Sequence, residues 1–123
     1  MRIQVKSIYK RPSPEDGERI YVDPLWANGA FTEFVKISDW NKEVAPSYEL
    51  WRFHYHPENW DEYVRRYREE LSHPDKQAAL KKLLQKAANG TLTLVYGNGD
   101  EAHNNARVLK DILEEMAREK KAA

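Results

Sequence analysis

Residues 92–113, LTLVYGNGDEAHNNARVLKDIL, constrain the fold more than any other part of the sequence. The stretch opens with a nearly continuous apolar strand of the kind that is buried in parallel sheets. Gly97 and Gly99 bracket a turn, and a helix is predicted from Asp100 to about Lys120. A strand that passes directly into a helix indicates an α/β protein with a mainly parallel sheet and right-handed crossovers.

The rest of the chain supplies further strands and helices. Alternating apolar residues predict a first strand in residues 2–9, RIQVKSIY, and a second short strand in residues 19–26, which Pro24 ends. Residues 27–40 are ambiguous between a short strand and an irregular lid. We therefore expect a small α/β sandwich in which about three to four strands are flanked by helices.

Helical periodicity is clearest in the second half of the chain. In residues 56–71, HPENWDEYVRRYREEL, an apolar stripe recurs at helical spacing, and its members are Trp60, Tyr63, Val64, Tyr67 and Leu71. Residues 75–90 form another predicted helix, and two short helices are expected around Pro46, with Ser47 as an N-cap. A chain of 123 residues fits one domain, 1–123, with residues 117–123 predicted to fray.

Composition restricts the function classes. Twenty Lys and Arg balance twenty Asp and Glu, which argues against duplex nucleic acid or an anionic membrane as a global partner. The absence of cysteine removes disulfides, thiolate catalysis and cysteine-based zinc sites. No signal peptide and no apolar run of about 18 residues is visible, so a cytoplasmic protein is expected. The oligomeric state is left open.

The turn around Gly97 and Gly99 is a candidate ligand site. It brings a strand end and a helix N-terminus together, where α/β proteins usually bind ligands. Its glycine spacing matches neither a Rossmann fingerprint nor a P-loop. Asp100 has two readings. The favoured one is an N-cap, and in that case its carboxylate occupies the N–H groups that an anion would use.

Asp23 and His103 are the candidate catalytic residues. Asp23 ends the second strand, and in a parallel sheet it would face His103 across one edge. Such a pair could act as general base and orienting group, or could be a buried structural pair. We predict that further side chains line the same site as ligand-binding groups, namely Trp26, Arg52, Tyr96, Asp100 and Asn104.

Three other readings are disfavoured. His54, His56 and His73 lack the spacing of a known zinc site, so neither a metal nor another cofactor is predicted. The aromatic stripe fits core packing better than base stacking. A solvated helix face explains the basic run better than nucleic-acid binding does, and its members are Arg65, Arg66 and Arg68.

Four motifs in order along the chain resemble one family, DUF488, a domain of unknown function, and in particular its short YeaO-like branch. The motifs are YVDPLWANG, WNKEVAPSYEL, HPENWDEYVRRYREEL and YGNGDEAHNN. The resemblance implies a compact α/β fold and a cytoplasmic protein, and it supplies no activity. Where the family's first motif has two arginines, this chain has Pro24 and Asn28. Either an anion site has been lost, or Arg11, Arg19 or Arg52 replaces it.

Two function hypotheses follow. The leading one is a small-molecule site at the sheet edge that binds an anionic or nucleotide-like ligand, with hydrolase or transferase chemistry left open. The alternative is a non-catalytic interaction or scaffold domain in which the same motifs determine the fold.

Overall fold

The four strands form one parallel sheet in the order β1-β4-β2-β3. The computed structural model describes residues 1–53 and 57–122. The central strand β4 pairs with β1 from Thr91 to Tyr96 and with β2 from Leu92 to Val95. This arrangement confirms the predicted small α/β domain. The strands are β1 (Arg2–Ser7), β2 (Glu18–Tyr21), β3 (Asp39–Trp40) and β4 (Thr91–Tyr96).

The helices differ greatly in length. The α-helices are α1 (Thr32–Val35), α2 (Tyr48–Phe53), α3 (Trp60–Leu71), α4 (Pro74–Ala88) and α5 (Asn105–Ala122). Three short 3-10 helices are η1 (Pro14–Asp16), η2 (Lys42–Val44) and η3 (Pro57–Asn59). Helix α5 begins at Asn105 rather than at the predicted Asp100, and it ends at Ala122.

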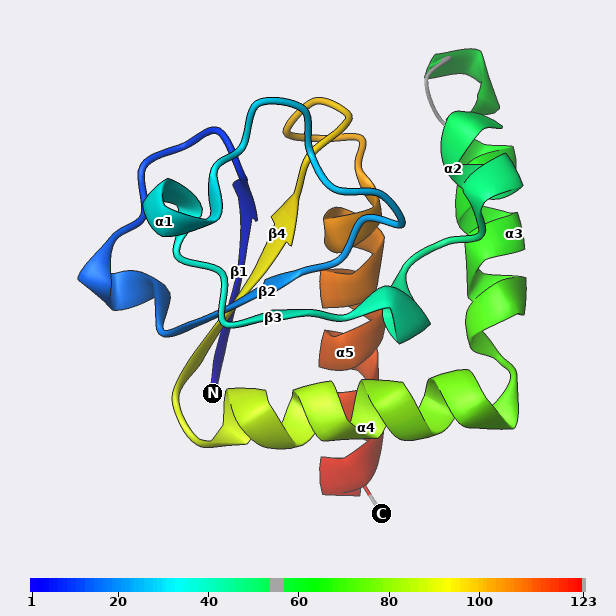
Figure 1. Cartoon of the computed structure of the whole chain (residues 1–123). Helices are drawn as coiled ribbons and strands as arrows, with labels where there is room; N and C mark the ends of the chain where they lie inside the picture. The colour runs from blue at the N-terminus through cyan, green and yellow to red at the C-terminus, as the bar shows by residue number, and fades with distance from the viewer. Residues whose placement is uncertain (54–56, 123) are drawn as a thin grey trace.

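The long helices cover one face of the sheet, which we call the helical face. It presents the apolar side chains of Ile3, Ile20, Val22, Leu92, Leu94 and Tyr96. The stripe of α3 packs into this core through Tyr63, Tyr67 and Leu71, as predicted. In Figure 1, α5 stands to the right of the strands and α4 crosses below them, while the arrowheads of β1 and β4 point to the edge where the candidate site lies.

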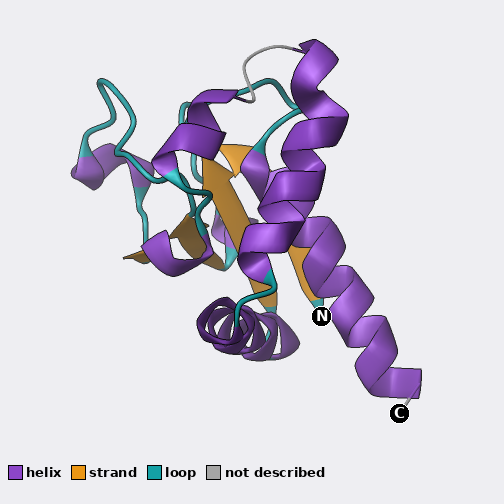
Figure 2. Cartoon of the chain, turned by 90° about the vertical axis from the view of Figure 1, so that its right-hand side faces the viewer, coloured by secondary structure: helices purple, strands orange, loops and turns teal. Residues whose placement is uncertain are grey.

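The opposite face, which we call the loop face, is covered by η1, α1 and connecting loops, which lie to the left of the strands in Figure 1, whereas Figure 2 looks at the molecule from the helical side. Its apolar part is small and centres on Ile8, Tyr21, Ala27, Val35 and Val95. Because strand side chains alternate, Tyr21 and Val95 point to this face while Ile20 and Leu94 point to the helices. The two faces thus differ in the size of the apolar cluster that each one buries.

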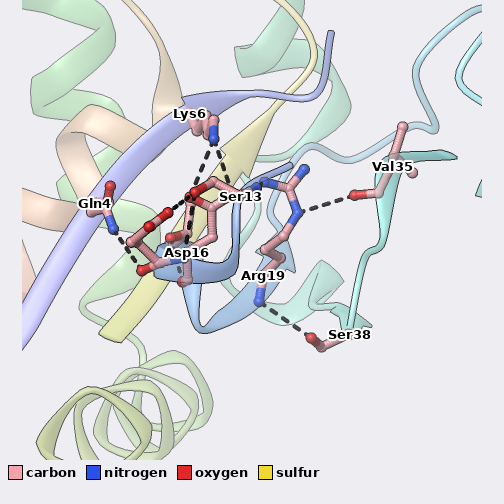
Figure 3. Close-up of polar contacts among 9 residues, drawn as sticks. Gln4, Lys6, Ser13, Asp16, Arg19, Val35 and Ser38 are labelled. Atoms are coloured by element: carbon pink, nitrogen blue, oxygen red, sulfur yellow. Dashed lines mark hydrogen bonds and ion pairs between the residues drawn. The ribbon is translucent and has the colours of Figure 1, made fainter. Parts of the chain in front are cut away.

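A buried ion-pair network completes the loop face (Figure 3). Asp16 and Arg19 are only 2% and 3% exposed, and their Oδ2 and Nη1 atoms lie 2.6 Å apart. Lys6 Nζ adds a contact of 3.1 Å to the same carboxylate. Arg19 Nε donates to the carbonyl of Val35 at 3.0 Å, and Arg19 N donates to Ser38 Oγ at 3.2 Å. The network therefore ties η1 to the C-terminal end of α1 and to the segment that follows it.

Candidate functional site

Asp23 lies fully buried at the carboxyl edge of the sheet, one residue beyond the backbone bond from Val22 N to Val95 O. Its Oδ2 atom accepts hydrogen bonds from Gly97 N at 2.9 Å and Asn98 N at 3.1 Å. This arrangement, which we call the clasp, joins the end of β2 to the loop after β4.

The two glycines of the turn allow neighbouring atoms to lie closer to the backbone than a side chain would permit. A Cβ on Gly97 would lie 2.8 Å from Tyr21 Oη and 3.2 Å from Asp23 Oδ2, so a side chain there would break the clasp. Gly99 has φ +105°, and a Cβ on it would lie 2.3 Å from the carbonyl oxygen of His103. Both positions need glycine for local geometry, without a ligand being invoked.

The Asp23 carboxyl group is electrostatically strained. Burial raises its pKa to about 6, and hydrogen bonding from Gly97 and Asn98 opposes this rise only in part. The side chains of Asn105 and Trp51 lie close enough to lower the pKa further. Among the described residues, Asp23 Oδ1 has no hydrogen bond of ordinary geometry, although Asn105 and Trp51 act on the same carboxyl group. A buried carboxyl with one satisfied oxygen is costly to ionise.

Asp100 and His103 form a separate pair on the surface. Asp100 Oδ1 accepts from Ala102 N at 2.9 Å and from His103 N at 2.8 Å, and it lies 3.0 Å from His103 Nδ1. The contact with His103 holds the pKa of Asp100 below its usual value. The imidazole also packs edge-on against Trp60, with 4.9 Å between ring centroids. The hydrogen bonds within the described part of the chain do not link His103 to Asp23.

Asn104, rather than Asp100, caps α5. Its Oδ1 atom accepts from Arg107 N at 2.8 Å, the geometry of an N-cap, and its Nδ2 atom donates to Asp100 O at 2.9 Å. The favoured prediction that Asp100 caps this helix is therefore corrected. Asp100 instead closes the turn that precedes α5, with bonds to N–H groups two and three residues ahead.

Two residues outside the predicted set lie beside Asp23. Asn105 is fully buried and donates from Nδ2 to Val22 O at 2.7 Å, while Trp51 is 8% exposed. They are the chain neighbours of Asn104 and Arg52, which the sequence favoured instead. Both residues could have been found from the sequence, because each lies on the apolar side of a helix. A polar group that faces the core needs a hydrogen-bond partner.

Four other predicted residues lie at the same edge as Asp23 or in the loop beside it, and two lie apart from it. Tyr96 ends β4 and is 4% exposed, and burial raises the pKa of its phenol. Trp26 packs on the loop face with its ring centroid 4.9 Å from that of Tyr21. Arg52 is exposed, with its guanidinium 5.6 Å from the ring centroid of Tyr48. The structure brings together Asp23, Tyr96, Asp100, His103 and Asn104 along one edge.

Within residues 1–53 and 57–122, no group of three His, Asp or Glu side chains could hold a metal ion. His54 and His56, which we weighed as zinc ligands, lie outside the described residues. None of the helices in the described ranges is long and apolar enough to cross a membrane.

Comparison with known proteins decides the family. The family model described as the inactive DUF488-N3 subclade matches residues 2–123. The chain belongs to this inactive DUF488-N3 subclade. The resemblance seen in the four sequence motifs is thereby confirmed.

Two relatives of this DUF488 chain carry names that state no activity. The uncharacterized protein Rv3073c of Mycobacterium tuberculosis is 36% identical over 114 residues, which cover 91% of this chain and 93% of the relative. The uncharacterized protein YeaO of Escherichia coli is 33% identical over 117 residues, which cover 94% of this chain and all of YeaO. No solved structure matches the chain.

Two of the three arginines that could replace the family's pair in this DUF488 chain lie away from the carboxyl edge. Arg19, one possible replacement, lies on the loop face, where Asp16 and Val35 bind its guanidinium. Arg52 lies over Tyr48. Neither arginine belongs to the group of residues at the carboxyl edge. The third possible replacement, Arg11, is exposed in the loop after β1.

Proposed function

We propose that this protein is a non-catalytic binding domain, in which the polar motif at the carboxyl edge holds the fold together. The clasp carries the proposal. The carboxyl group that would serve as general base is 0% exposed, and its Oδ2 atom is occupied by two backbone N–H groups. A general base must reach the proton that it removes, either directly or through one water.

The histidine supports the same conclusion. His103 faces Asp100 and Trp60 on the partly exposed side of the loop, and Asn104 is occupied as a helix cap. The description of the matching subclade as inactive also favours a role without catalysis. Binding, rather than chemistry, is then what the exposed surfaces of the domain provide.

A second candidate function rests on one observation, the ionisable group of Asp23. An asparagine could accept the same two N–H groups without the cost of a buried charge. A buried carboxyl with a raised pKa is the kind of group that marks ligand sites. Such a site would take a hydrogen-bond donor, such as the amino group of a nucleobase. The neighbouring carboxylates Asp100 and Glu101 make the edge less suited to an anion.

One experiment separates the two candidates. Thermal melting is measured with phosphate, sugar phosphates, nucleosides and nucleotides for the wild type and for the Asp23→Asn and His103→Ala variants. A non-catalytic domain with a structural clasp shows no compound-dependent shift that is specific to the wild type. A nucleoside that raises the wild-type melting temperature and leaves Asp23→Asn unchanged would overturn the proposal in favour of the edge site.

A further inference from the structure

A groove lies on the loop face, at the side of the sheet away from the long helices. It has a volume of about 530 Å³ and lies between the loop of residues 8–12 and the segment of residues 29–36. Ile8 and Val35 contribute buried apolar side chains to it, at 2% and 7% exposure. The volume is within the range of sites that accept small ligands or single side chains.

Aromatic side chains stand exposed along this groove. Tyr9, Phe31 and Phe34 are 60%, 65% and 68% exposed, although large apolar rings are usually covered. The two phenylalanine rings meet edge to face, with centroids 6.3 Å apart. Tyr9 is fixed in place because its hydroxyl donates to the carbonyl of Asn28 at 2.8 Å. The rings therefore form a defined apolar surface at the rim of a hollow.

The groove is positioned by the buried network beneath it. Arg19 Nε donates to the carbonyl of Val35, which lies at the end of α1. The next residue, Lys36, takes a left-handed conformation with φ 49°, uncommon for a residue with a side chain. Anchoring of this kind keeps α1, a single turn, in a fixed place relative to the loop after β1.

The groove is also positively charged. Its lining residues include three cations, Lys10, Arg11 and Lys36, against one carboxylate, Glu33. Lys10 also forms an ion pair with Glu101, in which Lys10 Nζ and Glu101 Oε1 lie 2.8 Å apart. The remaining positive charge favours an occupant that carries carboxylates beside an apolar group.

We propose that this groove binds a segment of another protein that inserts one aromatic or aliphatic side chain, flanked by Asp or Glu residues. The proposal rests on the non-catalytic binding function argued above and names its partner class. Aromatic residues and arginine are enriched in protein interfaces and dominate their binding energy. A single-stranded nucleic acid fits less well, because it needs a continuous basic track and this chain has no net charge.

The test begins with a selection that needs no known partner. Random displayed dodecapeptides are selected on the wild-type protein after depletion on the Phe31→Ser/Phe34→Ser variant. The recovered sequences are expected to share an apolar anchor next to Asp or Glu. Fluorescence anisotropy with a labelled recovered peptide then measures affinity for each variant. Both phenylalanines are exposed, so the variants are expected to fold, and melting curves verify this.

Matched variants define the expected result. Phe31→Ser/Phe34→Ser weakens peptide binding by at least about tenfold, as for the loss of interface hot spots. Arg11→Glu/Lys36→Glu also weakens it, and more at low salt. Tyr48→Ser and Lys82→Glu remove an exposed aromatic ring and an exposed cation elsewhere, and each leaves binding within about twofold of the wild type, as rim or remote positions do.

Three outcomes would overturn the inference. They are recovery of no enriched sequence, recovery of Lys- and Arg-rich sequences, and binding of labelled oligothymidine that is lost in the same groove variants. The Asp23→Asn variant keeps these failures distinct from failure of the proposed function. If it binds the peptide normally yet loses a nucleoside-dependent melting shift, the edge site is real and the groove proposal still stands.

Discussion

The two faces of the sheet are stabilised by different physics. The helical face is covered by three helices of 12, 15 and 18 residues, and its contacts are almost entirely apolar. The loop face has a small apolar cluster, one-turn helices and an ion pair whose partners are 2% and 3% exposed. Apolar packing tolerates a graded loss of volume, whereas a buried ion pair fails abruptly when one partner is removed.

The largest effect is expected from Asp16→Ala on the loop face. The change leaves the Arg19 guanidinium buried without its carboxylate, which costs about 4 kcal/mol in the free energy of unfolding. Urea denaturation measures this. The matched control is Glu62→Ala, which removes an exposed carboxylate that also pairs with two arginines, Arg65 and Arg66. Water solvates those arginines, so a small loss is expected from Glu62→Ala. A loss equal to that of Asp16→Ala would contradict the predicted difference between buried and exposed ion pairs.

Acid should weaken the same face. Burial acts to raise the pKa of Asp16, but hydrogen bonds from Ser13, Lys6 and Arg19 outweigh it and hold the pKa below its usual value. The stabilisation is therefore present above the unfolded-state pKa and is lost as pH falls through the folded-state pKa. Asp16→Ala should lose this acid-dependent component, and an unchanged acid limb in the variant would contradict the assignment.

The next effect compares neighbours on one strand. Leu94 points to the helical face and Val95 to the loop face, and both are 0% exposed. Leu94→Ala is expected to cost about 3 kcal/mol by opening a cavity among the helices. Val95→Ala removes less volume from a smaller cluster, at a cost of about 2 kcal/mol. Chemical denaturation measures the loss in free energy of unfolding for both variants. A larger loss in Val95→Ala than in Leu94→Ala would contradict the expected difference between the two faces.

The clasp, where the two faces meet, predicts an opposite response to pH. The folded-state pKa of Asp23 is about 6, above the usual 3.8, so its contribution to stability is full below pH 3.8 and is lost as pH rises through 6. The difference corresponds to at most about 3 kcal/mol. Asp23→Asn should match or exceed the wild type in stability at pH 8, and the difference between the two proteins should shrink toward pH 4. A variant that is less stable at pH 8 would show that the clasp needs the charge.

Periodicity explains why the helical face could be predicted. Tyr63, Tyr67 and Leu71 repeat at helical spacing, and the apolar run before Gly97 has only one reasonable place, inside a parallel sheet. The loop face has no such signal. Asp16 and Arg19 are ordinary charged residues in a Pro- and Gly-containing stretch, and only the three-dimensional structure brings Lys6 to the same carboxylate.

The candidate site was predicted in part for a related reason. Its residues follow strand ends, so the sequence could assign Asp23 and Tyr96 to one edge of the sheet. The partners of Asp23 could not be predicted, because they are the backbone N–H groups of Gly97 and Asn98, which no side chain marks. The cap was misassigned because two capping residues, Asp100 and Asn104, lie within one turn of each other.

The smallest effect tests that corrected cap. Asn104→Ala removes the hydrogen bond from Arg107 N and leaves the start of α5 without its side-chain acceptor, so a loss of about 1 kcal/mol in the free energy of unfolding is expected. Asn98→Ala is the matched control, because Asn98 acts in the clasp through its backbone N–H, which the substitution keeps. Equal melting temperatures for the two variants would mean that α5 does not depend on Asn104. A larger loss in Asn98→Ala would mean that the side chain of Asn98, rather than the Asn104 cap, stabilises this region.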